Sequence, residues 1–442
     1  MTATRFETGD AVVDAALADL AVADPATAER AADGFTALTW GRGLPAVSLR
    51  GLQEFLWYQL PYKHGGPLAE QRATAQALGV LFDRLGRTRY ADTCRGSGTD
   101  KVLAAYAADD QAGFAAYRKA LTVGGVEPPD LPDLLVWGGV LGVEEHAAFW
   151  AVADHLEQSI NNGVYTPGGA GWRTAAARVA AQVLTVPRLE LRGDAYLTRI
   201  HAERRDRWAH SRGPARTALT QQVLPLLVED QPVPDDADDH LAQIRWFLNQ
   251  CAGDGAQLTV NHTLSRAVLT EASHRFNWLV LGKQAPPENQ LPEAHHLRGI
   301  ADQLGAIRRR GRRLLLTTRG QHLLHADTAT LWASVTAALI PSEPAEAAAA
   351  EIMLMLLVTG PPPRYDSPTV ADALTGEGWT TDAGPLTRDR TGWLTGPLFG
   401  RLDFLGLQDK PTLTGRSQLT PAGHAAALKA LRHRAHAPRQ HP

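Results

Sequence analysis

One pattern constrains the fold more than any other: a helix, a glycine, a short hairpin and a second helix follow one another in residues 292–324. Apolar side chains recur at helical spacing from the start of this segment until Gly305 interrupts them. Two short runs typical of β-strands are then joined through Gly311, which favours a tight hairpin. This order predicts a winged-helix module whose wing is the hairpin. The helices expected before it span 241–249 and 264–276.

The same order recurs near the C-terminus. A helix expected over 393–405 is followed by Gly406, by a segment that can fold back on itself, and by a helix that begins at Pro421. Both segments also share the form Leu-Thr-x-x-Gly, at 316–320 and at 419–423, where the hairpin ends and the next helix begins. The C-terminal half is therefore expected to contain two winged-helix modules.

The N-terminal half reads as a series of amphipathic helices. One of them, at 51–60, is expected to end at Pro61, and Ser97 with Asp100 predicts a capping box for another. Residues 229–239 hold six acids and two prolines, a composition that resists packing and indicates a domain boundary. We therefore expect a mainly α chain. Its expected domains are a helical domain (1–230) and two winged-helix modules (236–340 and 342–442).

Composition limits the classes of function. The chain of 442 residues has only two cysteines, Cys94 and Cys251, far apart in sequence, which argues against a disulfide scaffold and fits a reducing compartment. No signal peptide and no membrane span is evident, so a cytoplasmic location without membrane contact is expected. The net charge of −3 gives no general attraction to nucleic acid, so any such binding must come from a local cluster of basic residues.

Such a cluster lies on the first expected wing. Seven arginines and one acid, Asp302, fall between Arg298 and Arg319. Guanidinium groups bind phosphate oxygens bidentately, and a wing contacts the DNA backbone or minor groove beside a recognition helix. The candidate DNA-binding residues are Arg308, Arg309, Arg310, Arg312 and Arg313 on the wing, Arg319 after it, and His295, His296, Arg298 and Gln303, expected to be exposed on the preceding helix. The alternative is a solvated hairpin that is rich in arginine only because of high-GC coding bias.

Other chemistry has weak support in the sequence. The glycine-containing stretch 95–101 lacks the spacing of a phosphate-binding loop. The sixteen histidines are not clustered with other ligands at metal-binding spacing, and no nucleophile elbow or cysteine–histidine pair is evident. We therefore expect no metal and no cofactor, and the sequence does not point to an enzyme.

Several stretches resemble a known group of proteins. Residues 246–339 are similar to the C-terminal part of uncharacterised actinobacterial proteins related to transposon-passenger proteins. The matching stretches are Leu258-Thr259, Gly282-Lys283, 297–320 and, in the N-terminal half, 57–61 and 126–129. His262-Thr263 departs from the group, which usually carries a small residue and an aromatic there. The resemblance implies a tandem winged-helix fold but no particular activity.

The leading hypothesis is a protein that binds double-stranded DNA, regulatory or chromosome-associated, whose N-terminal half forms homo-oligomers or senses a ligand. One alternative is a protein-interaction scaffold whose winged helices do not bind DNA. Another is a DNA glycosylase-like repair enzyme, since bacterial glycosylases that remove bulky alkylated bases are built from tandem winged helices. Their Gln-aliphatic-Gln signature is absent, because Gln221-Gln222 and Gln284 lack that spacing.

Overall fold

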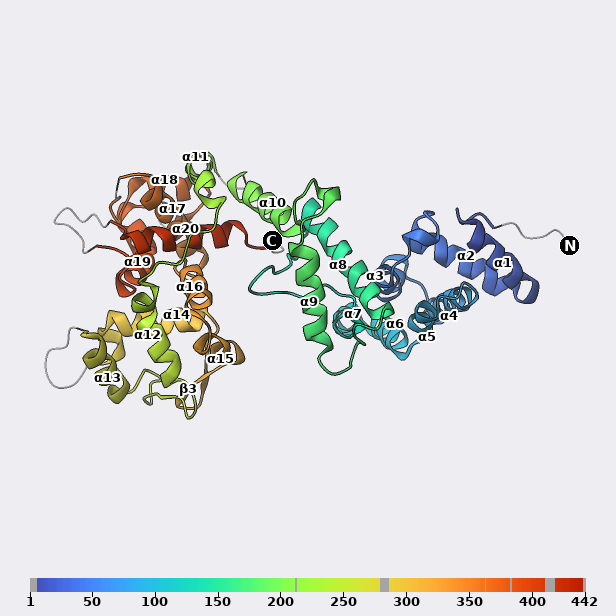
Figure 1. Cartoon of the computed structure of the whole chain (residues 1–442), viewed down its shortest axis with the longest axis horizontal. Coiled ribbons are helices and arrows are strands. Elements are labelled where there is room, and N and C mark those ends of the chain that lie inside the picture. Colours follow the sequence, from blue (N-terminus) through green and yellow to red (C-terminus); the bar gives the residue numbers. More distant parts are fainter. Residues whose placement is uncertain are drawn as a thin grey trace. The chain divides into compact units, whose positions relative to one another are not determined.

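The computed structural model describes residues 6–210, 213–278, 286–361, 363–381, 384–409 and 418–439. The described chain is mainly helical, as expected, with one three-stranded and one two-stranded antiparallel sheet (Figure 1). It divides into two compact units. The first contains the described residues up to Ile200 together with Pro438 and Arg439, and the second runs from His201 to Ala437. No helix within these ranges is long and apolar enough to cross a membrane.

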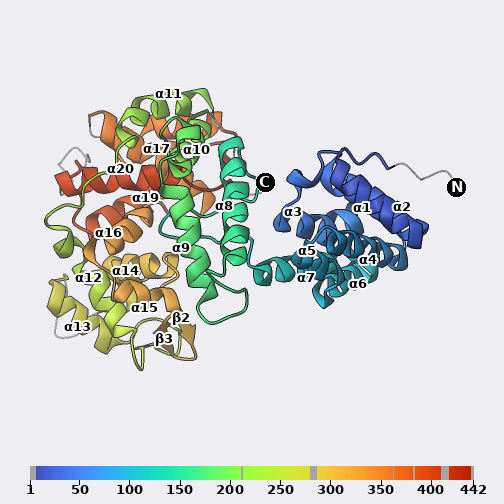
Figure 2. The ribbon, with the colours of Figure 1, turned by 45° about the vertical axis from the view of Figure 1, so that its right-hand side comes forward.

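The first unit is built from helices around two hydrophobic cores. Its elements are α1 (Ala11–Ala23), α2 (Pro25–Thr39), η1 (Leu44–Ala46), α3 (Leu49–Glu54), η2 (Phe55–His64), α4 (Leu68–Arg84), α5 (Thr88–Arg95), α6 (Ser97–Ala108), α7 (Asp110–Gly124), α8 (Val143–Asn161), α9 (Trp172–Thr185) and η3 (Leu189–Leu191). Helices α1 to α7 enclose a core that includes Phe35, Phe55 and Phe82. Helices α8 and α9 lie side by side and form the second core, around Leu156 and Leu184 (Figures 1 and 2).

The helix expected to end at Pro61 continues past it. After α3 the backbone widens into the π-helix η2, which contains Pro61 and ends at His64. In a π-helix each N–H bonds to the carbonyl oxygen five residues earlier, so the turn is wider than in an α-helix. This extra room reduces the clash between the proline ring and the preceding turn. Leu60 and Pro61 are both buried, and this packing keeps the segment helical where the isolated sequence indicates a break.

The prediction that Ser97 and Asp100 form a capping box is also wrong. Helix α6 begins at Ser97 with Gly96 as its N-cap, and no side chain caps it. The hydroxyl of Thr99 donates instead to the carbonyl oxygen of Thr93 at 2.7 Å and accepts from Nε1 of Trp57 at 2.8 Å. The start of α6 is therefore held by the contact of Thr99 with Trp57 of η2, and not by a local capping box.

The second unit contains the remaining elements. They are α10 (Tyr196–His210, which begins in the first unit), α11 (Pro214–Val223), η4 (Leu224–Leu227), α12 (Ala237–Gln250), β1 (Ala256–Gln257), α13 (Arg266–Phe276), η5 (Glu288–Gln290), α14 (Pro292–Gln303), β2 (Ile307–Arg310), β3 (Arg313–Leu316), α15 (Thr318–Leu324), α16 (Thr328–Ala337), α17 (Pro344–Thr359), α18 (Pro368–Gly376), β4 (Thr380–Thr381), β5 (Gly384–Pro385), α19 (Arg388–Phe404) and α20 (Pro421–Ala435). One continuous hydrophobic core extends from Trp208 to Ala435 and is shared by both expected modules.

The hairpin expected around Gly311 is confirmed. Strand β3 lies between β1 and β2 in the three-stranded sheet, with Arg310 opposite Arg313 beside the turn and Ala256 opposite Leu314. Within its unit, the hairpin lies at the end away from α17 and α18 (Figures 1 and 2).

The second expected hairpin can be followed only at its base. Its turn, residues 410–417, and the Gly282-Lys283 stretch lie outside the described residues. At the base, the amide of Asp409 donates to the carbonyl oxygen of Gln418 at 2.8 Å, and Gln408 forms an isolated bridge with Leu419.

The acidic stretch 229–239 lies inside the second unit, whereas the structural division falls within α10. A buried ion network explains why α10 and α11 belong with the C-terminal elements. Arg216 of α11 is fully buried and pairs with Glu351 of α17 and with Glu377, 3.4 Å away. Nε1 of Trp208 on α10 also donates to Glu351, so removal of these helices would leave a buried carboxylate with fewer partners.

Candidate nucleic-acid interface

Arginines cover one face of the β2–β3 hairpin. Successive side chains of a strand point to opposite faces, so Arg308 and Arg310 share a face of β2, and Arg313 lies opposite Arg310. The other face carries buried apolar side chains, namely Ile307, Leu314 and Leu316. The sequence alternation thus buries one face of the hairpin in the core and leaves three arginines on the other.

The turn places a further arginine at the tip of the hairpin. Gly311 and Arg312 form a two-residue loop, and Gly311 has a φ of +60°, a conformation that favours glycine. A two-residue loop with glycine in its first position suits the twist of an antiparallel pair. Arg312 is exposed beside it.

Four side chains, Arg308, Arg309, Arg310 and Arg312, are here called the hairpin arginines. All four are exposed, and none pairs with a carboxylate of any described residue. Arg313 differs, because its Nη1 donates to the carbonyl oxygens of Asp254 at 2.8 Å and Gly255 at 3.4 Å. Arg309 lies on the same face of β2 as Ile307 but is exposed, so the hairpin arginines occupy both faces and the turn. Their positive charge is not neutralised by the described part of the protein.

Arg298 of α14 has a structural partner. Its Nη1 lies 3.1 Å from Oε1 of Glu288 and donates to the carbonyl oxygen of His262 at 3.0 Å. Glu288 is only 8% exposed and also accepts from the amide of Leu264. Arg298 thus neutralises a carboxylate that would otherwise be buried without a cation.

His296 of α14 faces α19. A Cβ placed on Gly400 would lie 2.2 Å from Nε2 of His296, so the ring occupies the space that a side chain would need. Burial, with the neighbouring His295 and Arg401, lowers the pKa of His296 to about 4. The imidazole is therefore neutral at pH 7.

Gln303 at the end of α14 also contacts other elements. Its Nε2 donates to the carbonyl oxygen of Ile340, and its Oε1 accepts from Nη1 of Arg401, both at 2.7 Å. Arg401 donates in turn to the carbonyl oxygen of Ala338. These bonds fix the end of α14 to α19 and to the segment after α16.

These positions correct one part of the sequence analysis. Of the four α14 side chains expected to be exposed, only His295 is; His296, Arg298 and Gln303 are partly buried and hold contacts within the protein. Arg319, at the start of α15, is exposed as expected. The structure therefore gathers the arginines on the hairpin but does not present the α14 side chains beside them as a free surface.

The described residues offer no alternative centre for metal or thiol chemistry. They contain no group of three or more His, Cys, Asp or Glu side chains that could hold a metal ion. Cys94 and Cys251 are buried, and burial raises the pKa of each thiol to about 12, so neither supplies a thiolate near neutral pH.

No known family, curated protein or solved structure matches this chain.

Sequence reasoning located the hairpin arginines but missed Gly400 and Arg401. Neither residue belongs to a recognisable motif, and both act on α14 only because α19 packs against it. The sequence contains one weak indication of this contact. Gly400 is a glycine within the expected helix, and a glycine there is typical of a place where another element approaches the backbone closely.

Proposed function

We propose that the second unit contains two winged-helix modules and binds double-stranded DNA through the hairpin arginines. The element order α12, β1, α13, α14, β2, β3, with β3 in the centre of the sheet, supports the first module. The series α17, α18, α19, a segment bridged at its base, and α20 supports the second.

The observation that carries this proposal is the absence of ion pairs at the hairpin arginines among the described residues. Elsewhere in the same unit, arginines such as Arg216, Arg245 and Arg298 pair with carboxylates. Like charges crowded on a short hairpin repel one another, and an anionic partner relieves that repulsion. Phosphate oxygens spaced along a duplex provide such a partner, and arginine binds them bidentately.

The mode of binding follows from the contacts of α14. A recognition helix reads bases with side chains that reach into the major groove. His296 and Gln303 instead contact α19 and its surroundings, so they are not presented for base contact. We therefore propose binding that is mainly to the phosphate backbone and depends little on DNA sequence.

The test is the triple substitution of Arg308, Arg310 and Arg312 by Ala, with binding to duplex DNA measured by fluorescence anisotropy over a range of salt concentrations. Each lost phosphate contact lowers the slope of log affinity against log salt by roughly 0.9. We expect weaker binding to every duplex sequence and a slope smaller by up to about 2.7. The free energy of unfolding should change by no more than about 0.5 kcal/mol for each exposed site.

A control variant with the same change in net charge replaces three exposed arginines on other elements of this unit, Arg266, Arg275 and Arg390, by Ala. It should retain nearly all of the affinity and of the salt slope. If the hairpin variant binds duplex DNA as tightly as the parent, with an unchanged slope, the hairpin is only solvated and the scaffold hypothesis takes its place.

Three other expectations also stay predictions. They are the relationship to the actinobacterial proteins described above, self-association through the helical first unit, and a cytoplasmic location. None is needed for the DNA-binding proposal.

A further inference from the structure

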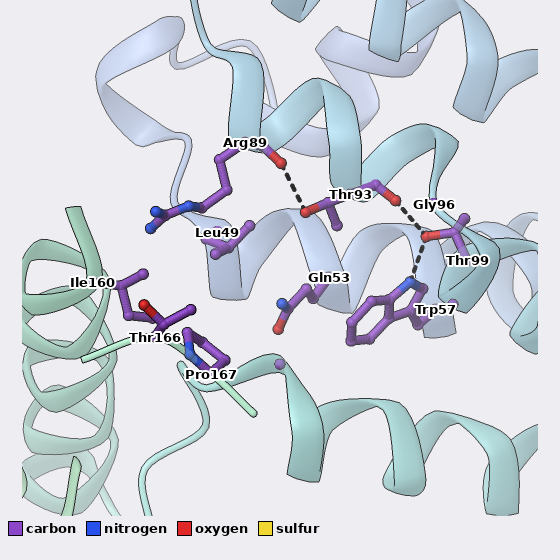
Figure 3. A pocket seen from close by; sticks show the side chains of 12 residues that line it. Leu49, Gln53, Trp57, Arg89, Thr93, Gly96, Thr99, Ile160, Thr166 and Pro167 are labelled. Atoms are coloured by element: carbon purple, nitrogen blue, oxygen red, sulfur yellow. Dashed lines mark hydrogen bonds between the residues drawn. The ribbon is translucent and has the colours of Figure 1, made fainter. Parts of the chain in front are cut away.

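A cavity of about 340 Å³ lies within the first unit, and none of the residues of the proposed DNA interface lines it. Figure 3 shows it between the α3–η2 segment and the loop that carries Thr166 and Pro167. The residues that line it are Leu49, Gln53, Trp57, Arg89, Thr93, Gly96, Gly98, Thr99, Gly124, Ile160, Thr166 and Pro167. This volume is within the range of cavities that hold small molecules.

The wall of the cavity contains a buried acceptor without a partner. Gln53 is only 3% exposed, and its Oε1 has no hydrogen-bond partner. Its carboxamide lies against Gly124, where a Cβ would be 2.8 Å from Nε2, so the glycine leaves just enough room for the amide. Buried amide oxygens are nearly always paired, and an unpaired one in the wall of a cavity favours a ligand that brings an N–H or O–H donor.

A second polar region lies at the edge of the same cavity. Arg89 is exposed, and the partner found for its guanidinium among the described residues is neutral, Oδ1 of Asn161 at 2.8 Å. Gly96 and Gly98, at the start of α6, also line the cavity, and no side chain caps that helix. Figure 3 shows Arg89 and Gly96 on opposite sides of the cavity, so the guanidinium of Arg89 is the group that favours an anion there.

Most of the other large side chains in the lining are apolar, and three threonines, Thr93, Thr99 and Thr166, complete it. Leu49 and Trp57 lie on the α3–η2 side, and Ile160 and Pro167 on the other (Figure 3). Nε1 of Trp57 is already bonded to Thr99, so the indole offers a hydrophobic surface rather than a donor. The occupant must therefore have an apolar body between its two polar ends.

We propose that this cavity binds a small organic acid whose carboxylate lies near Arg89, and whose hydroxyl or amino group donates to Oε1 of Gln53. This binding function is independent of the DNA interface and of its test.

Three related probes separate the two polar contacts. The first, 4-hydroxybenzoate, carries both the anion and the donor; benzoate lacks the donor, and 4-hydroxybenzamide lacks the charge. Binding to the full chain is measured by isothermal titration calorimetry and by saturation-transfer NMR. We expect 4-hydroxybenzoate to bind with a Kd on the order of 1 mM or lower, and each of the other two about tenfold more weakly.

Two variants assign the contacts. Gln53→Leu should weaken 4-hydroxybenzoate about tenfold and leave benzoate unchanged. Arg89→Gln should weaken both carboxylates and leave 4-hydroxybenzamide unchanged. The control Arg72→Gln, which alters an arginine of α4 outside the cavity, should bind all three probes like the parent.

Thermal unfolding supplies a readout that does not need a ligand. Because an unpartnered buried acceptor destabilises the fold, Gln53→Leu should raise or preserve the melting temperature. A clear fall would show that Gln53 has a structural partner and would overturn the proposal. Failure of the full chain to bind 4-hydroxybenzoate at about 10 mM, or equal binding by Gln53→Leu, would overturn it as well.

Discussion

The imidazole of His296 on α14 rests directly on Gly400 of α19, so closely that a Cβ at position 400 would lie 2.2 Å from Nε2. These two residues belong to the third helices of the two proposed modules. Their contact, with the hydrogen bond between Gln303 and Arg401, joins the proposed modules through the helices that a winged-helix protein commonly uses to read DNA.

The contact predicts that Gly400→Ala destabilises the second unit. The matched control is Gly299→Ala in α14, where an added Cβ meets no atom within 4 Å and should be neutral or slightly stabilising. We expect the free energy of unfolding in urea to be lower for Gly400→Ala than for the control by about 1–3 kcal/mol. Adding His296→Ala should recover part of the loss. Equal stability of the two glycine variants would show that α14 and α19 do not pack this closely.

Arg298→Ala tests whether this residue serves the fold or base recognition. The substitution leaves Glu288 buried without its cation, so we expect a loss of about 1–3 kcal/mol in the free energy of unfolding. Sequence preference in DNA binding should not change. Arg309→Ala on the hairpin is the exposed control and should alter stability by less than about 0.5 kcal/mol. A variant of unchanged stability that binds with altered sequence preference would restore α14 as a recognition helix.

Arg216→Met tests the buried ion network. Burial raises the pKa of Glu351, but the charges of Arg216 and Arg434 outweigh it and hold that pKa below its usual value. Without Arg216, the buried carboxylate of Glu351 keeps only Arg434 as a cationic partner among the described residues. We expect the free energy of unfolding, measured in urea, to fall by about 3–5 kcal/mol. Arg364→Met breaks the exposed pair with Asp366 and should cost less than about 1 kcal/mol. Similar effects in both variants would contradict the buried geometry.

The same network predicts where a stable C-terminal fragment must begin. A fragment of residues 196–437 retains Trp208 and Arg216, whereas one of residues 236–437 loses both. We expect cooperative unfolding of the longer fragment, followed by circular dichroism, and lower stability or partial unfolding of the shorter one. Equal stability would place the boundary at the acidic stretch instead.

Acid should destabilise the second unit before its carboxylates become protonated. His201 and His436 stack with ring centroids 3.9 Å apart, and burial lowers their pKa values to about 4 and about 2. Because the unfolded histidines have pKa values near about 6.5, the unfolded state binds more protons below that pH. Stability is therefore fully present above about pH 6.5 and falls as the pH decreases toward 4. Urea midpoints measured at pH 7 and pH 5 check this.

His201→Gln should reduce the difference between the two midpoints, because one of the buried groups no longer titrates. His274→Gln, at an exposed site on α13, should leave the difference unchanged. A midpoint independent of pH in the parent protein would show that these histidines are not held neutral by the fold.

The sequence alone determined the elements whose contacts are local. The hairpin at Gly311 depends on a glycine in the turn and on alternation over a few neighbouring residues, so its position and its exposed arginines followed from the pattern. The α14 helix was predicted to within one residue of its end for the same reason.

Tertiary structure decided what those elements face. Gln303 and Arg401 are 98 residues apart, and nothing in the periodicity of α14 indicates that α19 covers it. The continuation of η2 through Pro61, the replacement of the Ser97 cap by the Thr99–Trp57 bond, and the pocket around Gln53 likewise depend on residues from separate helices. The local sequence sets the propensity of each segment to form a helix or a strand. Burial and the pairing of polar groups across the core then determine which contacts each segment makes.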